Sequence, residues 1–279
     1  MFQVRPLLPR CLAALCLLFP WTTPTRSLAE PQRLTMEEAE ALPTAFPTTL
    51  VPPTTQSLRP IYERLRQLEN PALTGKLVSI VLSLGTLRVP ISVEECGVAD
   101  AYYWPQKRSI TLCYEHMVQA NRLMGKPVAQ QNQVDSTVAA LVVFTAFHEI
   151  GHALVHTLSL QFPGREEDVA DQFATFFMIQ SGEAAFARRI VQAPAAYFSH
   201  RSQAGAQNSR TAASSVHSPG LERSQNILCL LYGRYRDPEI GQKLGARAAD
   251  CPAQYARAAA TWNAQLAPYA RVLGGKTFE

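Results

Sequence analysis

Two histidines and a glutamate occur at a spacing that suits metal chemistry, in the segment His148-Glu149-Ile150-Gly151-His152. Residues four positions apart on a helix share one face, so His148 and His152 could reach a single zinc ion at about 2.0–2.1 Å each. Glu149 would lie about 100° around the helix, where it reaches a metal-bound water without ligating the metal. This His-Glu-x-x-His pattern is typical of zinc hydrolases, and it predicts a zinc site with Glu149 as the general base.

A third ligand is predicted downstream, after a turn at residues 162–164. The apolar spacing of residues 165–182 predicts a second helix, on which Glu167 and Asp171 share one face. We expect Glu167 to be the third metal ligand and Asp171 to accept a hydrogen bond from the free ring nitrogen of a ligating histidine. The neighbouring Glu166 and Asp168 should point elsewhere, toward solvent or the helix dipole. A charged helix start without a metal is the alternative.

The helix that carries the histidines should begin at Asp135 or Ser136, since either side chain can cap a helix. Residues 138–147 are apolar nearly all round, as in a helix buried inside a domain. This run is too short to span a bilayer, which needs roughly 20 apolar residues. Gly151 within the helix costs about 1 kcal/mol relative to alanine, which predicts the close approach of another element, made easier by Ala170 and Ala174. The alternative is a buried helix without metal, in which two imidazoles and a carboxylate would be expensive to bury.

The two motifs together resemble a known group of proteins. The strings HEIGHALVH and GREEDVADQFATFFMI are similar to an uncharacterised bacterial family of mostly secreted proteins regarded as metallopeptidases. Glu-x-x-x-Asp after His-Glu-x-x-His also looks like the gluzincin arrangement of zinc peptidases, and more distantly like the metallopeptidases that cleave phage-type repressors. The likeness runs from about Glu94 onward and includes Cys96-Gly97, residues 111–115, His217-Ser218 and residues 226–229. It implies a zincin-like fold and peptidase chemistry, with no substrate to transfer.

Two further histidines could serve the same site. Gluzincins often supply an oxyanion donor from a downstream element, and the resemblance gives this role to His217. The family tends to place acidic residues just before that histidine, whereas Ser215 and Val216 stand there in this chain, so an exposed loop histidine is the alternative. His156 lies one turn beyond His152 and is expected to be a packed or surface histidine, not a ligand.

The N-terminal residues 1–29 are typical of a secretory signal, with Arg5 and Arg10, an apolar core and a small-residue cleavage site at residues 27–29. Removing them takes away three arginines and no acids, so the net charge falls from +4 to about +1. A nearly neutral protein gives no reason to expect nucleic-acid binding. We therefore expect a periplasmic or secreted protein with no stable membrane span after removal of the signal.

The cysteines agree with export. Cys96, Cys113, Cys229 and Cys251 remain after the signal, an even number that permits three pairings in an oxidising compartment. We favour Cys96–Cys113 and Cys229–Cys251, because each pair is local in the sequence. A cysteine zinc site is the alternative, although no Cys-x-x-Cys pair exists to nucleate it.

The remaining chain predicts an α+β protein, with a small N-terminal sheet and a helical C-terminal part. Residues 30–60, rich in proline and threonine, are expected to be an arm or linker, and residues 61–279 a single zincin-like domain. Strands are expected at residues 77–82, 87–93, 102–103 and 109–113, with residues 110–114 as the candidate strand beside the active site. Helices are expected at residues 61–68, 115–124, 184–197 (interrupted near Pro194), 222–235, 238–245 and 252–269, and loops at residues 125–133 and 200–220.

These patterns combine into one functional expectation, an exported zinc metallopeptidase that acts on a peptide or protein substrate. One alternative is an envelope binding protein that zinc stabilises without turnover. The presence of Glu149 argues against it, because a structural zinc site does not need this residue and usually has four protein ligands. The other alternative is a zinc hydrolase of a non-peptide amide. The sequence gives no expectation for the oligomeric state.

Overall fold

The computed structural model describes residues 33–68, 70–124, 131–180, 184–207, 219–273 and 276–277. Residues 31–279 form one unit, and all elements below belong to it. The predicted signal at residues 1–29 and the predicted oxyanion donor His217 lie outside the described residues.

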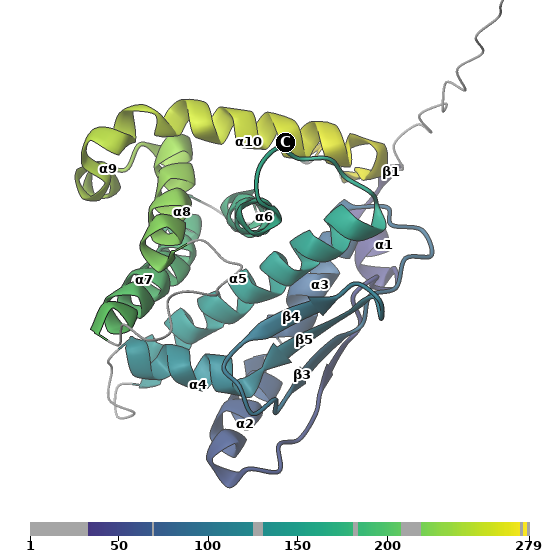
Figure 1. The fold of residues 1–279 in the computed structure, drawn as a ribbon. Helices are drawn as coiled ribbons and strands as arrows, with labels where there is room; N and C mark the ends of the chain where they lie inside the picture. Colours follow the sequence, from purple (N-terminus) through teal and green to yellow (C-terminus); the bar gives the residue numbers. More distant parts are fainter. Residues whose placement is uncertain are drawn as a thin grey trace, which may run out of the picture. The chain divides into compact units, whose positions relative to one another are not determined.

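The unit is a mixed α/β structure that is mostly helical, as Figure 1 shows. Its main sheet has the strand order β2-β3-β5-β4, with bounds Thr48–Leu50, Ile91–Glu94, Ser109–Cys113 and Ala101–Trp104. The first three strands are parallel, and β4 runs antiparallel to β5. The expected small N-terminal sheet with a helical C-terminal part is therefore present.

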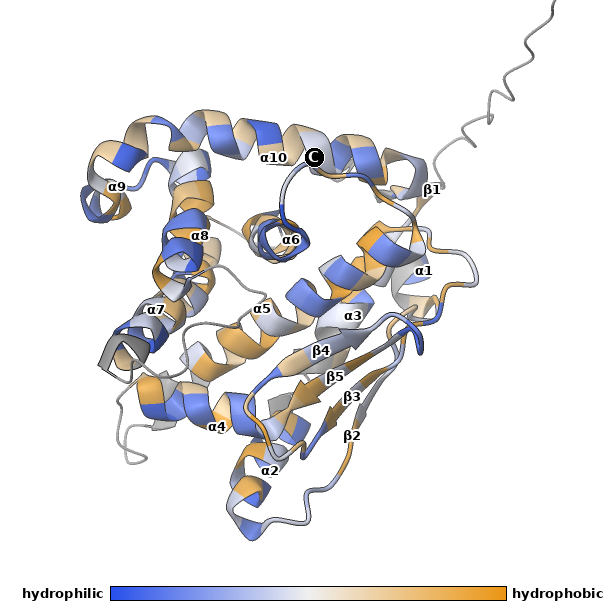
Figure 2. Cartoon of the chain, in the orientation of Figure 1, coloured by the Kyte–Doolittle hydropathy of each residue, from blue (hydrophilic) through white to orange (hydrophobic). Residues whose placement is uncertain are grey.

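The alternation of side chains explains which face of the sheet is buried. Ile91 and Val93 of β3 are buried, and so are Ile110 and Leu112 of β5, which lie opposite them in register. In Figure 2 hydrophobic residues are correspondingly prominent on these two strands. Residues 110–114 were the predicted strand beside the active site, but β5 lies inside the sheet. Strands β2 and β4 are the edges of the main sheet, and both β4 and β5 contact the histidine helix α5 (Gln131–Thr157).

The main helices of the unit lie partly between β2 and β3 in the chain and partly after β5. They are α2 Arg59–Leu68, α3 Asn70–Val81, α4 Tyr114–Leu123, α5, α6 Glu166–Gln180, α7 Ala184–Gln207, α8 Gly220–Tyr235, α9 Pro238–Leu244 and α10 Cys251–Leu266. Helix α6 contacts α5, α7, α8 and α10, and in Figure 1 it lies between α5, α8 and α10. Nearly every residue of its stretch 169–179 is buried, because helices surround it.

Helix α5 is longer than its apolar run suggested. It begins at Gln131, so Asp135 and Ser136 lie within the helix and do not start it. The segment Thr137–Thr157, with mean hydropathy 1.7, is long and apolar enough to cross a membrane, but 78% of its most apolar window is buried inside the protein. Its apolar character is thus accounted for by packing in the core.

The close approach predicted at Gly151 is present. A Cβ atom at Gly151 would lie 3.3 Å from the Cα atom of Ala170 and 3.2 Å from the Cβ atom of Phe173, both on α6. Contacts this short leave no room for a larger side chain without a shift of one helix. The glycine therefore fixes the spacing between the two helices that carry the predicted ligands.

Two N-terminal predictions are wrong. Residues 77–82 were expected to be a strand, but most of them belong to helix α3. The expected arm at residues 30–60 contains β1 (Arg33–Leu34), α1 (Met36–Ala41) and β2, and its Phe46 is fully buried. A Cβ atom at Gly75 of α3 would lie 2.6 Å from the Cβ atom of Phe46, so this segment packs directly on the helix.

The C-terminal predictions hold with one exception. Helix α7 continues through Pro194 to Gln207, where an interruption and then a loop were expected.

The two predicted disulfides are both present, Cys96–Cys113 and Cys229–Cys251. A second small sheet pairs β1 in parallel with β6 (Val272–Leu273), which also pairs with β7 (Lys276–Thr277).

Candidate metal centre

Helices α5 and α6 bring the three predicted metal ligands together. His148 and His152 come from one face of α5, and Glu167 comes from the first turn of α6. The Nε2 atoms of the histidines lie 3.2 Å apart, and His148 Nε2 lies 3.3 Å from Glu167 Oε2. Ligand atoms at about 2.0–2.1 Å from a tetrahedral ion lie roughly 3.3 Å from one another. His152 Nε2 lies somewhat farther, 3.7 Å, from Glu167 Oε1, and the three donors are close enough together to share one metal ion.

Each histidine is oriented by a carboxylate at its other ring nitrogen. His148 Nδ1 donates to Asp171 Oδ1 at 2.8 Å, the partner that the sequence predicts. His152 Nδ1 donates to Glu166 Oε1 at 2.6 Å, although Glu166 was expected to point elsewhere. Its side chain is 57% exposed, so it reaches back to the histidine from the helix surface. Both hydrogen bonds leave Nε2 as the nitrogen that faces the other donors, which is the tautomer that metal binding needs.

Asp171 is held by a buried arginine that sequence reasoning missed. Arg223 of α8 donates from Nε to Asp171 Oδ2 at 2.8 Å and from Nη2 to Oδ1 at 2.7 Å. The guanidinium also lies 3.8 Å from the ring centroid of Phe198 on α7. A bidentate pair of this kind fixes the plane of the carboxylate as well as its charge. The orientation of His148 therefore depends on α8, 52 residues beyond Asp171.

The electrostatics of the centre follow from this chain of contacts. Burial alone would raise the pKa of Asp171, but Arg223 and His148 lower it to about 2. Burial alone would lower the pKa of His148, but its bonds to Asp171 and Glu167 raise it to about 9. The surrounding carboxylates thus attract positive charge, whether a proton or a metal ion. Metal uptake at Nε2 would have to displace the proton.

Glu149 lies beside the donors on α5 and is buried, with 5% of its surface exposed. Its charge helps to raise the pKa values of both His148 and His152. It also contributes, after burial and Asp100, to a raised pKa of Tyr102 on β4. Glu149 therefore acts electrostatically on the metal donors and on the edge strand alike.

His156 lies near the C-terminal end of α5, on the helix face that carries His148 and His152. It is exposed, and its Nδ1 atom lies 2.8 Å from the Tyr103 hydroxyl on β4. The contact ties the edge strand to the histidine helix one turn beyond His152. The expectation that His156 is a surface histidine therefore holds.

One other group in the described residues has the composition of a metal site, namely Cys96, Cys113 and Glu115. The two sulfurs are joined in a disulfide, so they offer no thiolate to a metal. The Glu115 carboxylate instead accepts backbone N–H bonds from Cys96 and Gly97. This group is a structural clamp at the end of β5.

A family model, DUF4344, described as "Putative metallopeptidase", matches residues 51–266. No curated protein and no solved structure matches the chain. The matched range contains both motifs of the centre and both disulfides.

Proposed function

Since the chain belongs to the DUF4344 family of putative metallopeptidases, we propose that it is an exported, zinc-dependent peptidase of the gluzincin type with a zincin-like fold. The observation that carries the proposal is the geometry of His148, His152 and Glu167, whose donor atoms all lie within 4.8 Å of one another. Export is supported by the two disulfides, which persist in oxidising compartments.

The donor set fits zinc. Two imidazole nitrogens and one carboxylate are the ligands of many catalytic zinc sites, which keep a fourth position open for water. Their spacing suits a tetrahedral ion, and the carboxylates of Asp171 and Glu166 on the outer nitrogens are the usual supports of such histidines. A structural site would instead be expected to have a fourth protein ligand.

A bound zinc ion would supply a Lewis acid that lowers the pKa of a coordinated water toward ~7 and polarises a peptide carbonyl. Glu149 would accept the proton of the attacking water and deliver it to the leaving amine. Its buried position keeps this carboxylate away from bulk water. Asp171, itself held by Arg223, would keep His148 in the productive orientation.

The edge strand β4 would orient the substrate. Its partner β5 occupies one edge, so in the main sheet the other edge of β4 is open to an added strand. The contact between Tyr103 and His156 holds this strand against α5. A peptide that pairs with β4 would lie extended along the helix that carries the metal ligands.

The test is metal analysis combined with cleavage profiling on a peptide library. The wild-type protein should hold one zinc ion, and Glu149→Gln should keep the zinc while losing hydrolysis. His148→Ala should lose both, and Glu222→Gln, at an exposed carboxylate of α8, should lose neither. A wild-type protein without any transition metal after purification free of chelators would refute the proposal. Zinc binding without cleavage of any library peptide would refute the peptidase activity.

A further inference from the structure

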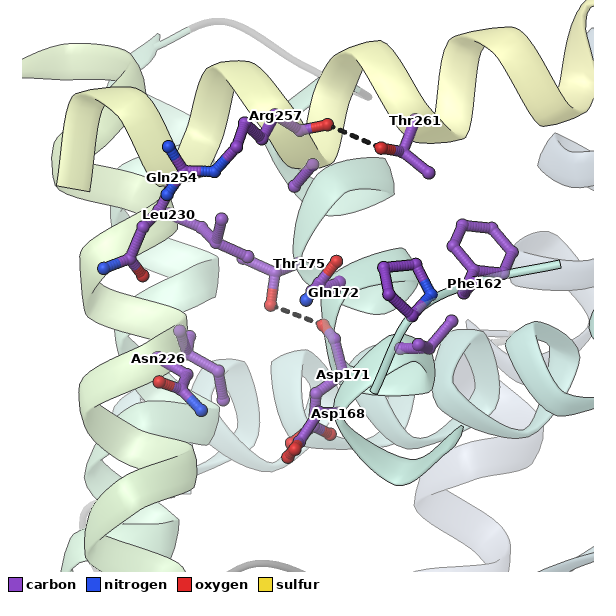
Figure 3. Close-up of a pocket in the computed structure, with 14 residues that line it drawn as sticks. Phe162, Asp168, Asp171, Gln172, Thr175, Asn226, Leu230, Gln254, Arg257 and Thr261 are labelled. Atoms are coloured by element: carbon purple, nitrogen blue, oxygen red, sulfur yellow. Dashed lines mark hydrogen bonds between the residues drawn. The ribbon is translucent and has the colours of Figure 1, made fainter. Parts of the chain in front are cut away.

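A cavity of about 450 Å³ lies between α6, α8 and α10, and Figure 3 shows the side chains that line it. Its volume falls within the roughly 300–1,000 Å³ that is usual for small-molecule sites. Among the proposed metal ligands and their supporting residues, Asp171 alone belongs to its lining. The cavity is therefore a different site from the metal centre, although the two share one wall.

The lining combines an apolar surface with amide groups from three helices. Phe162, Ile227 and Leu230 contribute apolar surface. The Phe162 ring is held in place by Trp262, at 4.2 Å between ring centroids. The side-chain amides come from Gln172 of α6, Asn226 of α8 and Gln254 of α10, and Figure 3 labels all three around the cavity.

An amide side chain both donates and accepts hydrogen bonds, which is what a peptide group needs from its partner. Asn226 is fixed by Arg247, whose guanidinium donates to its Oδ1 atom, so the Asn226 NH2 group remains as a donor. Gln172 and Gln254 stand on separate helices, and Asn226 on a third. Amide groups placed on three rigid elements can therefore meet successive polar groups of one ligand.

The charges of the lining favour an anion. Both acids already have cationic partners, since Arg165 donates to Asp168 at 3.0 Å and Arg223 donates to Asp171. Arg257 is the remaining charge of the lining, and within the described residues its guanidinium has no ion pair. A guanidinium binds a carboxylate in a bidentate manner.

We propose that this cavity binds the C-terminal end of a short peptide, with the terminal carboxylate on Arg257 and the peptide groups on the three side-chain amides. The apolar surface of Phe162, Ile227 and Leu230 would receive the last side chain. Binding here does not depend on the metal. Only the link to turnover, in which the N-terminal cleavage product carries such an end, rests on the proposed function.

Three probes separate the parts of this recognition in titration calorimetry. They are acetyl-alanyl-leucine, its C-terminal amide, and 4-methylpentanoate, which has the carboxylate without the peptide groups. The zinc-loaded Glu149→Gln protein prevents turnover of the probes. Acetyl-alanyl-leucine should bind on the order of tenfold more tightly than either of the other probes, because only it offers both kinds of group.

Substitutions then locate the site. Arg257→Gln should weaken acetyl-alanyl-leucine about tenfold and abolish its advantage over the amide probe, while the helix is retained. Gln172→Leu should weaken both peptides and leave 4-methylpentanoate unchanged. Arg189→Gln, at an exposed arginine of α7, is the matched control and should change nothing. Unfolding midpoints confirm that each variant is folded.

The absence of binding at millimolar probe, or an unchanged preference for the free carboxylate in Arg257→Gln, would overturn the proposal. Binding that survives Arg257→Gln but is lost in His148→Ala would place the peptide at the metal centre. That result would overturn the cavity site and leave the proposed peptidase activity standing.

Discussion

Replacement of Arg223 by methionine should lower the free energy of unfolding by about 3–5 kcal/mol, because it removes the guanidinium that neutralises the buried Asp171 carboxylate and leaves His148 as its remaining partner. The guanidinium donates two hydrogen bonds to Asp171 and lies over the ring of Phe198. The Asp171 side chain is only 6% exposed, so water cannot replace the lost bonds. Methionine keeps much of the apolar volume of the arginine stem, so the loss should come mainly from the ion pair.

The measurement is urea unfolding at pH 7, with and without a chelator, so that any loss of metal is counted separately. Arg165→Met is the matched control, because Arg165 also links α6 to α8 through Glu222, at 3.5 Å. Its side chain is 52% exposed, and exposed ion pairs contribute about 0–1 kcal/mol. The double variant Arg223→Met/Asp171→Asn should recover part of the loss, since a neutral amide costs less to bury than a carboxylate.

A loss no larger in Arg223→Met than in Arg165→Met would refute this reasoning. It would mean that water solvates the Asp171 carboxylate, or that the ion pair orients the side chains without adding to the free energy of unfolding. A double variant less stable than Arg223→Met would also count against a stranded charge as the cause of the loss.

Three further predictions concern other parts of the structure. Glu166→Ala should weaken metal binding about 10–100-fold in a chelator competition assay, because it frees the outer nitrogen of His152, and unchanged affinity would contradict the role of this contact. Burial lowers the pKa of His116 to about 4. The folded state then binds fewer protons than the unfolded state between about pH 4 and 6.5, so stability should fall as pH drops through this window. His116→Gln should flatten that pH dependence, measured by urea unfolding, and an unaltered slope would exclude His116 as its source. Replacing Cys229 and Cys251 together by alanine should cost about 2–5 kcal/mol in the same assay, whereas a reduced wild-type protein of full stability would show that the bond contributes nothing.

The two helices of the candidate centre could be predicted from the sequence because their signals are local. The spacing of His148 and His152 and that of Glu167 and Asp171 need only the helical repeat to bring each pair onto one face. The glycine at position 151 then indicates where the helices meet. All of these contacts are present in the structure.

The supporting contacts could not be predicted because they depend on tertiary structure. Arg223 looks like one more polar residue of a helix, and nothing near it in the sequence shows that it is buried against Asp171. Glu166 and Glu167 are neighbours that differ only in side-chain conformation, so no pattern assigns Glu166 to His152. A signal was available for Arg223 only in retrospect, since Asp171 on a buried face requires a cationic partner.

The wrong N-terminal assignments have a similar origin. The run Leu77 to Leu82 is largely β-branched and apolar, which is typical of a strand, yet most of it belongs to helix α3, which packs against α5 and β2. Tertiary packing overrides such a preference readily. The proline- and threonine-rich residues before it lack periodicity because they form very short elements, and their anchor is the single buried ring of Phe46.

Because β1 pairs with β6, the folded unit begins before and ends after residues 51–266, the range that the family model matches. Arg33 and Leu34 lie in register with Val272 and Leu273, so segments some 240 residues apart in the chain are hydrogen-bonded neighbours. A fragment trimmed to residues 51–266 would lose both strands, and with them β2 and the ring of Phe46. Strand β3 would become an unpaired edge of the main sheet, and the side of Gly75 that Phe46 covers would be exposed to solvent. Because β1 and β7 belong to the same small sheet, the unit should tolerate circular permutation. A short linker would join β7 to β1, and the new termini would lie in the turn between β4 and β5.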